Sequence, residues 1–350
     1  MSKFKANYTL YIYSIGLLCF LSACQKPSPQ EPVVSVPVTL ADSLPSPAHN
    51  PISREGVALG KLLFHDPALS GNNSISCATC HVQPLGYADG QTLSTLGSSQ
   101  QALSRHTLPL INLAWRKELF WDGGVKNLES VAFAPLLHPD EMAQNLKELP
   151  QELRQRKEYR LRFKTVFGSD SITNAMIARA LAQYQRTLIS GNSKYDRFIK
   201  DAAGFSELEL KGLELFTKNC SGCHPPPFFT DDDYHHIGLD SVYQEGALGI
   251  LQGRFRITRD STDMGKFRTP TLRNVTATAP YMHDGRYPTL QHVLNHYREK
   301  VLPVPSLDPA LLQDPQKPGL SLSSTEQTAL IAFLHTLTDS AFLYQPSSVK

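Results

Sequence analysis

The chain has 350 residues, with 34 Lys and Arg against 32 Asp and Glu, a net charge of +2 at pH 7, and 41% hydrophobic residues. Charges of both signs are mixed along the chain, and this balance argues against nucleic acid as the partner. The length is sufficient for two globular domains of ordinary size.

The first 23 residues are typical of a secretory signal peptide. Lys3 and Lys5 form a basic start, and the apolar stretch that follows, about Tyr11 to Leu21, is too short for a permanent transmembrane helix. The sequence then reads Leu-Ser-Ala-Cys up to Cys24, which resembles the lipobox of bacterial lipoproteins, where the cysteine becomes the first residue and carries the lipid. This predicts export with a lipid anchor at Cys24. The alternative is an ordinary signal peptide that is cleaved nearby.

Residues 24–52 are predicted to form an extended tether between the membrane and a globular body. Seven prolines lie between Pro27 and Pro51, with little apolar content and no helical or strand period. Proline-rich segments of this kind are semi-rigid and extended. A disordered N-terminus without a spacing role is the alternative.

The body that follows is predicted to be mainly α-helical. Apolar residues recur at helical spacing over Arg54–His65 and over most of Leu161–Ile199. Capping boxes at Ser206-x-x-Glu209 and Ser323-x-x-Glu326 open two further helices, of which the second is expected to be the last of the chain. Long alternating runs are absent, so few strands are expected.

Two pentapeptides carry the attachment pattern of a c-type haem. Two thiols three positions apart can each form a thioether to the same porphyrin, and the adjacent histidine can then ligate the iron. A thioredoxin-like pair or a zinc site is the alternative, although a zinc ribbon needs its cysteine pairs roughly 15–20 residues apart. The two copies are Cys77-Ala78-Thr79-Cys80-His81 and Cys220-Ser221-Gly222-Cys223-His224.

The repeated motif predicts two covalently bound haem c groups in two cytochrome-c-like domains, residues 53–200 and 201–345. The remaining cysteines of the chain, Cys19 and Cys24, lie in the export segment. If Cys24 carries a lipid, the mature protein retains no free thiol that an oxidant could attack.

Several further motifs resemble the bacterial di-haem cytochrome c peroxidase/MauG superfamily over roughly residues 53–340. The resemblance implies one haem that is open to peroxide and a second haem that relays electrons from an external donor. The matching segments are Leu59-Gly60-Lys61-Leu62-Leu63-Phe64, Phe120-Trp121-Asp122-Gly123, His138-Pro139-Asp140-Glu141-Met142, Thr269-Pro270-Thr271-Leu272-Arg273-Asn274-Val275 and Ala279-Pro280-Tyr281-Met282-His283-Asp284-Gly285.

By this resemblance, His81 is the proximal ligand of the peroxide-binding haem and Glu141 is the distal acid–base group. Cleavage of peroxide needs a group that moves a proton from the near to the far oxygen, and burial would raise the pKa of a carboxyl in a haem pocket. The alternative for Glu141 is a surface carboxylate at a helix start. Trp121 matches the tryptophan between the two haems, with a purely structural aromatic as the alternative.

Typical family peroxidases have a second histidine in the loop after the first motif, and it blocks this haem until the other haem is reduced. No histidine occurs between Val82 and Arg105 in this chain. We therefore expect the first haem to be open when both irons are ferric. His106 stands where the family usually has Asn.

The sixth ligand of the second haem sets its electronic character. Alignment of Thr289-Leu290 with the family's helix start places Tyr297 where peroxidases have an axial Met and MauG-type proteins have Tyr. A phenolate favours oxidised iron and lowers the reduction potential, whereas a thioether raises it. The other possible assignments are a core tyrosine at this position or ligation by His296, Met282 or Met264.

The family also binds calcium between its domains, through two backbone carbonyls and an Asn side chain. Thr278 and Pro280 match the carbonyl positions, but His106 at the Asn position is a poor ligand for a cation that prefers oxygen. His235 and His236 follow three aspartates and are interpreted as exposed loop polarity rather than as a metal site.

The combined prediction is a lipid-anchored, periplasmic di-haem peroxidase, placed at the outer membrane. It would reduce hydrogen peroxide to water with electrons from a small cytochrome c or copper protein. A MauG-like enzyme that oxidises side chains of a partner protein is the second hypothesis, favoured by Tyr297 and the missing loop histidine. A pure electron-transfer cytochrome is the third. The family resemblance also favours a homodimer.

Overall fold

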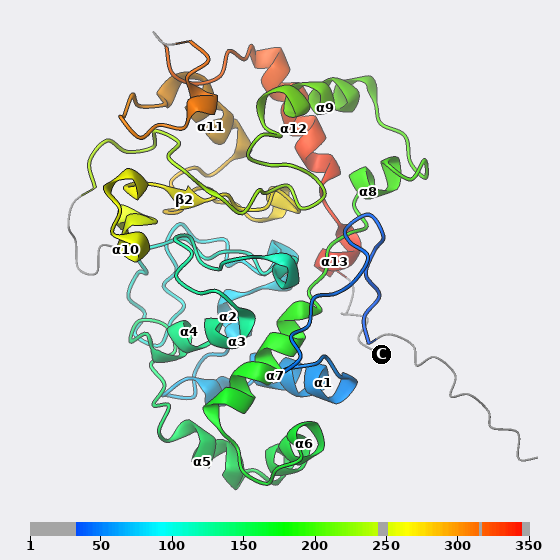
Figure 1. Ribbon diagram of the computed structural model, residues 1–350, viewed down its shortest axis with the longest axis vertical. Coiled ribbons are helices and arrows are strands. Elements are labelled where there is room, and N and C mark those ends of the chain that lie inside the picture. The colour runs from blue at the N-terminus through cyan, green and yellow to red at the C-terminus, as the bar shows by residue number, and fades with distance from the viewer. Residues whose placement is uncertain (1–32, 244–250, 315–316, 345–350) are drawn as a thin grey trace, which may run out of the picture. The chain divides into compact units, whose positions relative to one another are not determined.

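The computed structural model describes residues 33–243, 251–314 and 317–344, and the described chain is mainly helical with little strand (Figure 1). The predicted signal peptide, the anchor Cys24 and the first part of the predicted tether lie outside the described residues. Within the described ranges, no helix combines the length and the apolar character needed to cross a membrane.

The described helices are short to medium in length, and the one small sheet has two strands. The strands β1 (Tyr234–His235) and β2 (Phe267–Arg268) pair antiparallel, with Tyr234 opposite Arg268. The helices are α1 (Arg54–Phe64), α2 (Cys77–Cys80), α3 (Leu128–Val131), α4 (Phe133–Leu137), α5 (Leu149–Gln155), α6 (Lys157–Phe167), α7 (Asn174–Arg186), α8 (Lys194–Phe198), α9 (Glu207–Asn219), α10 (Phe255–Thr258), α11 (Leu290–Asn295), α12 (Ser324–Thr336) and α13 (Ser340–Tyr344), with a π-helical turn at His296–Lys300.

The first hydrophobic core forms where α1 crosses α7 (Figure 1). The Ser53 hydroxyl accepts the Gly56 N–H and so caps the N-terminus of α1, a common way for serine to start a helix. Gly60 lies at the crossing, where a Cβ atom would come within 2.0 Å of the Ala180 carbonyl oxygen. The absence of a side chain at this position therefore lets the two helix backbones approach closely.

The second core repeats this arrangement where α9 crosses α12. Here a Cβ atom on Gly212 would come within 2.0 Å of the Ala329 carbonyl oxygen. Both helices begin with the predicted capping boxes, in which the backbone N–H of the capping serine donates to the glutamate three residues later. The predicted helix starts at Ser206 and Ser323 are thus confirmed.

The chain passes from the first core to the second between α7 and α8. Leu188 belongs to the first core, whereas Tyr195 packs against the second. Contrary to the prediction, α12 is not the last helix, because α13 follows it. Phe342 of α13 returns to the first core, with its ring centroid 5.6 Å from that of Tyr87. The domain boundary near residue 200 stays a prediction.

The segment from residue 33 to 52 differs from the predicted tether, because it packs on the folded body. Leu40 is buried, and Val33 and Ile52 pack against the first core. Asn50 is only 2% exposed; it donates to Glu129 and accepts from Gln183, at 2.8 and 2.9 Å. The prolines of this segment suppress regular secondary structure. The apolar and amide side chains between them nevertheless pack against the rest of the folded chain.

The close crossing of α9 and α12 gives a stability prediction. Gly212→Ala should lower the midpoint of denaturant unfolding, because the added methyl forces the helices apart and overpacking costs about 1–3 kcal/mol. This outweighs the gain in helix propensity of up to about 1 kcal/mol. Gly204→Ala is the matched control, since a Cβ atom there meets nothing within 4 Å. Equal midpoints for the two variants would contradict the close-packing argument.

Candidate functional site

The first Cys-x-x-Cys-His motif lies on the wall of a cavity of about 410 Å³. Cys77 and Cys80 begin and end the single turn α2, so that the two thiols lie on one side of the turn. The Thr79 hydroxyl accepts the Ser76 N–H at 3.0 Å and stabilises the start of this turn. Both cysteines are free and both line the cavity together with His81.

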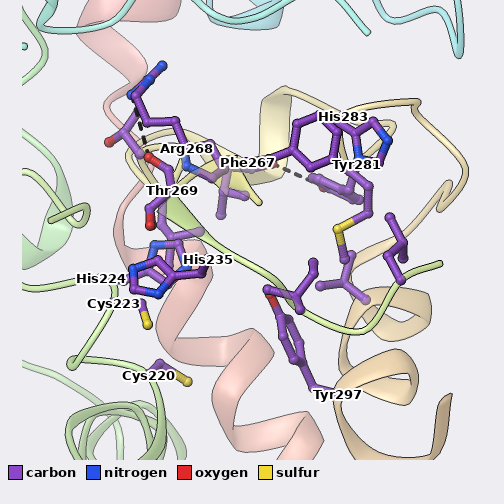
Figure 2. Close-up of a pocket in the computed structure, with 18 of the residues that line it drawn as sticks. Cys220, Cys223, His224, His235, Phe267, Arg268, Thr269, Tyr281, His283 and Tyr297 are labelled. Carbon is purple, nitrogen blue, oxygen red and sulfur yellow. Dashed lines mark hydrogen bonds between the residues drawn. The ribbon is translucent and has the colours of Figure 1, made fainter. Parts of the chain in front are cut away.

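The second motif lines a separate cavity of about 220 Å³ (Figure 2). Cys220 caps the C-terminus of α9, and Cys223 and His224 follow in the next turn. The cysteines are free in this motif too. Burial raises the pKa of the Cys220 thiol to about 12, just as it raises that of Cys77 in the first motif. All four sulfurs therefore lie on cavity walls, with neither pair closed into a disulfide.

The histidines of both motifs are held in the same way. Nδ1 of His81 is 2.7 Å from the Tyr87 carbonyl oxygen, and Nδ1 of His224 is 3.0 Å from that of Phe229. Burial lowers the pKa of both imidazoles, which favours the neutral ring. A neutral ring that donates from Nδ1 leaves Nε2 as the lone-pair nitrogen, the arrangement expected of a metal-ligating histidine.

Glu141 lines the first cavity together with His81, as the sequence predicts for a distal acid–base group. It lies in a turn after α4 and not at the start of a helix. Its backbone N–H donates to the His138 carbonyl at 3.1 Å, and its carbonyl accepts the Ser98 N–H at 2.6 Å. Burial raises the pKa of its carboxyl, so this group retains a proton at higher pH than an exposed glutamate does.

Trp121 lines both cavities and is only 7% exposed. Its indole N–H donates to the His106 carbonyl at 2.9 Å, and its own carbonyl accepts the Arg268 N–H at 2.8 Å. His106 and Arg268 line both cavities as well. These three residues therefore form part of a wall that the two cavities share.

Tyr297 lies across the second cavity from the haem-motif residues, with its hydroxyl directed into the cavity (Figure 2). It is in the π-helical turn, a local irregularity that is frequent at functional sites. Burial raises the pKa of its phenol. Among the other assignments, Met282 also lines this cavity, whereas both ring nitrogens of His296 have hydrogen-bond partners, the Tyr287 hydroxyl and the Ile237 carbonyl.

The positions that match the family's calcium site also meet at the second cavity. Thr278, Pro280 and His106 all contribute to its lining. Nδ1 of His106 is 2.8 Å from the Gln91 carbonyl oxygen, so this nitrogen already has a partner. Calcium binding stays a prediction.

His235 was expected on an exposed loop, but it lies in β1 and lines the second cavity. Its ring nitrogens are 2.5 Å from a carboxylate oxygen of Asp308 and 2.9 Å from one of Asp231. Interactions with Cys223 and these carboxylates raise the pKa of His235 to about 10. Cys223, His235 and Asp308 could hold a metal ion, but a haem attached at this motif would use the Cys223 sulfur.

Comparisons with known proteins agree with this geometry. A family model described as di-haem cytochrome c peroxidase matches residues 54–204, and one described as RoxA-like, cytochrome c-like, matches residues 266–301. The methylamine utilization protein MauG of Methylorubrum extorquens is 38% identical over 300 residues, which cover 85% of this chain and 82% of that protein. The chain belongs to the di-haem cytochrome c peroxidase/MauG family.

Two further similarities extend over most of the chain. Cytochrome c551 peroxidase of Nitrosomonas europaea is 32% identical, over 95% of this chain and 92% of that protein. A solved MauG-like protein associated with microbial copper homeostasis superposes with a TM-score of 0.79 at 32% identity, over 89% of this chain and 97% of that chain. The relatives thus include both proteins named as peroxidases and proteins named MauG.

The two cavities fit the haem c that this family implies, because each combines two free thiols with a partly buried imidazole whose Nε2 is left for iron. Three arginines that line the first cavity were not identified from the sequence. Arginine pairs well with carboxylates, and each of the three forms an ion pair with Asp122 or Asp232. They come from distant segments without a local pattern: Arg105, Arg256 and Arg268.

The motif geometry predicts two attached haems per mature polypeptide. Intact-mass measurement of the exported protein should show the added mass of two porphyrins. The double variant Cys220→Ser/Cys223→Ser should show one, because its second motif has no sulfur that can form a thioether. Cys77→Ser/Cys80→Ser is the reciprocal control. A wild-type mass without porphyrin would contradict the haem assignment.

Proposed function

We propose that this chain is a di-haem cytochrome c peroxidase that reduces hydrogen peroxide to water, with haem c held in two domains, residues 53–200 and 201–345. The observation that carries the proposal is Glu141, a partly buried carboxyl on the same cavity as the predicted proximal ligand His81. The relatives named as cytochrome c peroxidases support the same reading.

The bound haem would supply the iron at which peroxide is cleaved. Glu141 would accept a proton from the near peroxide oxygen and return it to the departing oxygen. Its burial supports this role, because a carboxyl with a raised pKa exchanges a proton at higher pH than an exposed glutamate does.

Electrons would come from a small cytochrome c or copper protein and pass through the second haem. Trp121 is the proposed link between the haems, because it lines both cavities. The first haem would be open in the ferric state, since no histidine occurs between Val82 and Arg105 to block it. Turnover would then need no reductive activation.

Tyr297 supports a second candidate function, the MauG-like oxidation of side chains on a partner protein. Its phenol lines the second cavity, and a phenolate ligand would lower the reduction potential of the second haem. The similarity to MauG proteins points the same way. A pure electron carrier is disfavoured, because electron transfer alone requires neither an acid–base group such as Glu141 nor an open position on the iron.

The proposed location is the periplasm, with an anchor in the outer membrane through lipid on Cys24. The signal-like start and the lipobox-like sequence support this placement. We also propose that calcium binds at the Thr278 and Pro280 carbonyls. A homodimer is the proposed assembly. His106 is a weak third ligand for calcium, because this cation prefers oxygen.

Steady-state oxidation of reduced cytochrome c by peroxide tests the peroxidase function. Glu141→Gln should lower the rate by about 10²–10⁴-fold with both haems attached, because general acid–base catalysis is lost. The exposed Glu148→Gln is the control. In the wild type, lowering the pH should slow turnover before the pH reaches the range in which ordinary glutamates become protonated. The raised pKa of Glu141 means that its base form is protonated at a higher pH. Full activity of Glu141→Gln would refute the assignment.

The role of Tyr297 can be tested by spectroscopy. The ferric wild type should show one high-spin haem, the first, and one low-spin haem with a tyrosinate spectrum. Tyr297→Met should raise the reduction potential of the second haem, because a thioether favours reduced iron. Tyr281→Phe is the control, since Tyr281 lines the same cavity but its hydroxyl donates to the Val275 carbonyl at 3.0 Å. An unchanged ferric spectrum in Tyr297→Met would exclude ligation by Tyr297.

A further inference from the structure

Several hydrogen bonds hold the turn that carries Glu141, and His138, directly after α4, accepts three of them. The carbonyl of His138 accepts the N–H groups of Glu141 and Ala143, at 3.1 and 3.0 Å. Its side chain adds a third bond, because Nδ1 is 3.1 Å from the backbone nitrogen of Asp140 and accepts that N–H. His138 thus accepts three hydrogen bonds from the next five residues.

The side-chain bond determines which ring nitrogen can carry the proton. Since Nδ1 accepts the Asp140 N–H, the neutral imidazole of His138 has its proton on Nε2. An Asn side chain makes the same bond to the N–H two residues later when it forms an Asx turn. The partly exposed His138 therefore takes the place of an Asx-turn residue here, and it lines the same cavity as Glu141.

The opposite side of the turn is closed by the loop at residues 97–99. Ser98 N–H donates to the Glu141 carbonyl at 2.6 Å, and the Ser99 hydroxyl donates to the Asp140 carboxylate at 2.9 Å. A Cβ atom on Gly97 would come within 1.8 Å of the Asp140 carbonyl oxygen. The turn cannot move toward this loop, and on the other side the bond to the His138 side chain adds to the main-chain bonds that hold the turn to the end of α4.

We propose that His138 is a positioning residue for Glu141. Through the bond from the Asp140 N–H to its Nδ1, it holds the turn so that the Glu141 carboxyl faces the cavity at a fixed place. The inference rests on the proposed function, in which this carboxyl moves the peroxide proton. His138 itself transfers no proton in this role.

Other charges also act on Glu141 and must be separated from the effect of the turn. Burial raises the pKa of the Glu141 carboxyl most strongly; His138 lowers it in its protonated form, in which Nδ1 cannot accept the Asp140 N–H, and Asp140 raises it. Cys77 and Cys80 also interact electrostatically with Glu141, but their thioethers would not ionise. A variant that only removes the imidazole changes both a charge and the turn.

Two amide variants of His138 separate the effect of the turn from the effect of the charge. His138→Asn places its oxygen near the position of Nδ1 and keeps the Asp140 bond, whereas His138→Gln places its oxygen near Nε2 and loses that bond. Both are uncharged. We expect turnover close to wild type in His138→Asn and about 10–100-fold lower in His138→Gln, the loss typical of a catalytic group displaced by about 1 Å.

A second measurement does not depend on turnover. The infrared band of the protonated Glu141 carboxyl, identified by its absence in Glu141→Gln, reports the pKa of this group. The pKa should stay raised in His138→Asn and fall in His138→Gln, because a loosened turn admits water to the carboxyl. His335→Asn, at an exposed position on α12, is the control. Equal haem content in all variants checks that the fold is intact.

The outcomes separate this inference from the proposed function. Equal turnover and equal infrared titrations of the Asn and Gln variants would overturn the positioning role, and so would damage of the same size in both. If the wild type binds both haems but shows no peroxide turnover, the proposed function fails. The infrared comparison then still decides the role of His138.

Discussion

A buried carboxylate, Asp122, fixes the relation between the two halves of the site. Its side chain is fully buried and forms ion pairs with Arg105 and Arg256, at 2.9 and 2.6 Å. Burial alone would raise the pKa of this carboxyl, but the two arginines lower it overall, so the group stays charged. A buried charge that is left without any partner costs about 3–5 kcal/mol, and Asp122 keeps one arginine even when the other is lost. The neighbouring Trp121 is therefore held in place between the cavities by the chain segment that Asp122 anchors.

The orientation of the two predicted histidine ligands depends much less on long-range structure. The carbonyl that orients His81 belongs to Tyr87, and the one that orients His224 belongs to Phe229. Each acceptor follows its histidine by a few residues, so that the motif and its own following loop can set the direction of Nε2 locally. This explains why a pentapeptide pattern is such a specific signal, since thiols, imidazole and orienting carbonyl all come from one short piece of chain.

The same distinction explains what could be predicted from the sequence. Capping boxes, helix positions and the haem motifs depend on neighbouring residues, and the helix starts at Ser206 and Ser323 were found correctly. Residues 33–52 were misread, because composition describes proline-rich chain well but does not reveal that Asn50 binds Gln183. Arg268 was missed for a related reason. Its place in the shared wall arises from contact with Trp121, which lies far away in the sequence.

The lining of the two cavities differs in a way that matches two different tasks. The first is the larger, at about 410 Å³, and a partly buried carboxyl, Glu141, lines it together with the predicted proximal histidine. Chemistry on peroxide needs a group that exchanges protons. The second, at about 220 Å³, contains Tyr297 and Met282 among many aliphatic side chains. If Tyr297 ligates the iron of the proposed second haem, the sixth position would be filled, which would suit electron transfer rather than binding of an oxidant. The proposed division of labour between the haems would thus follow from the residues that surround each copy of the same motif.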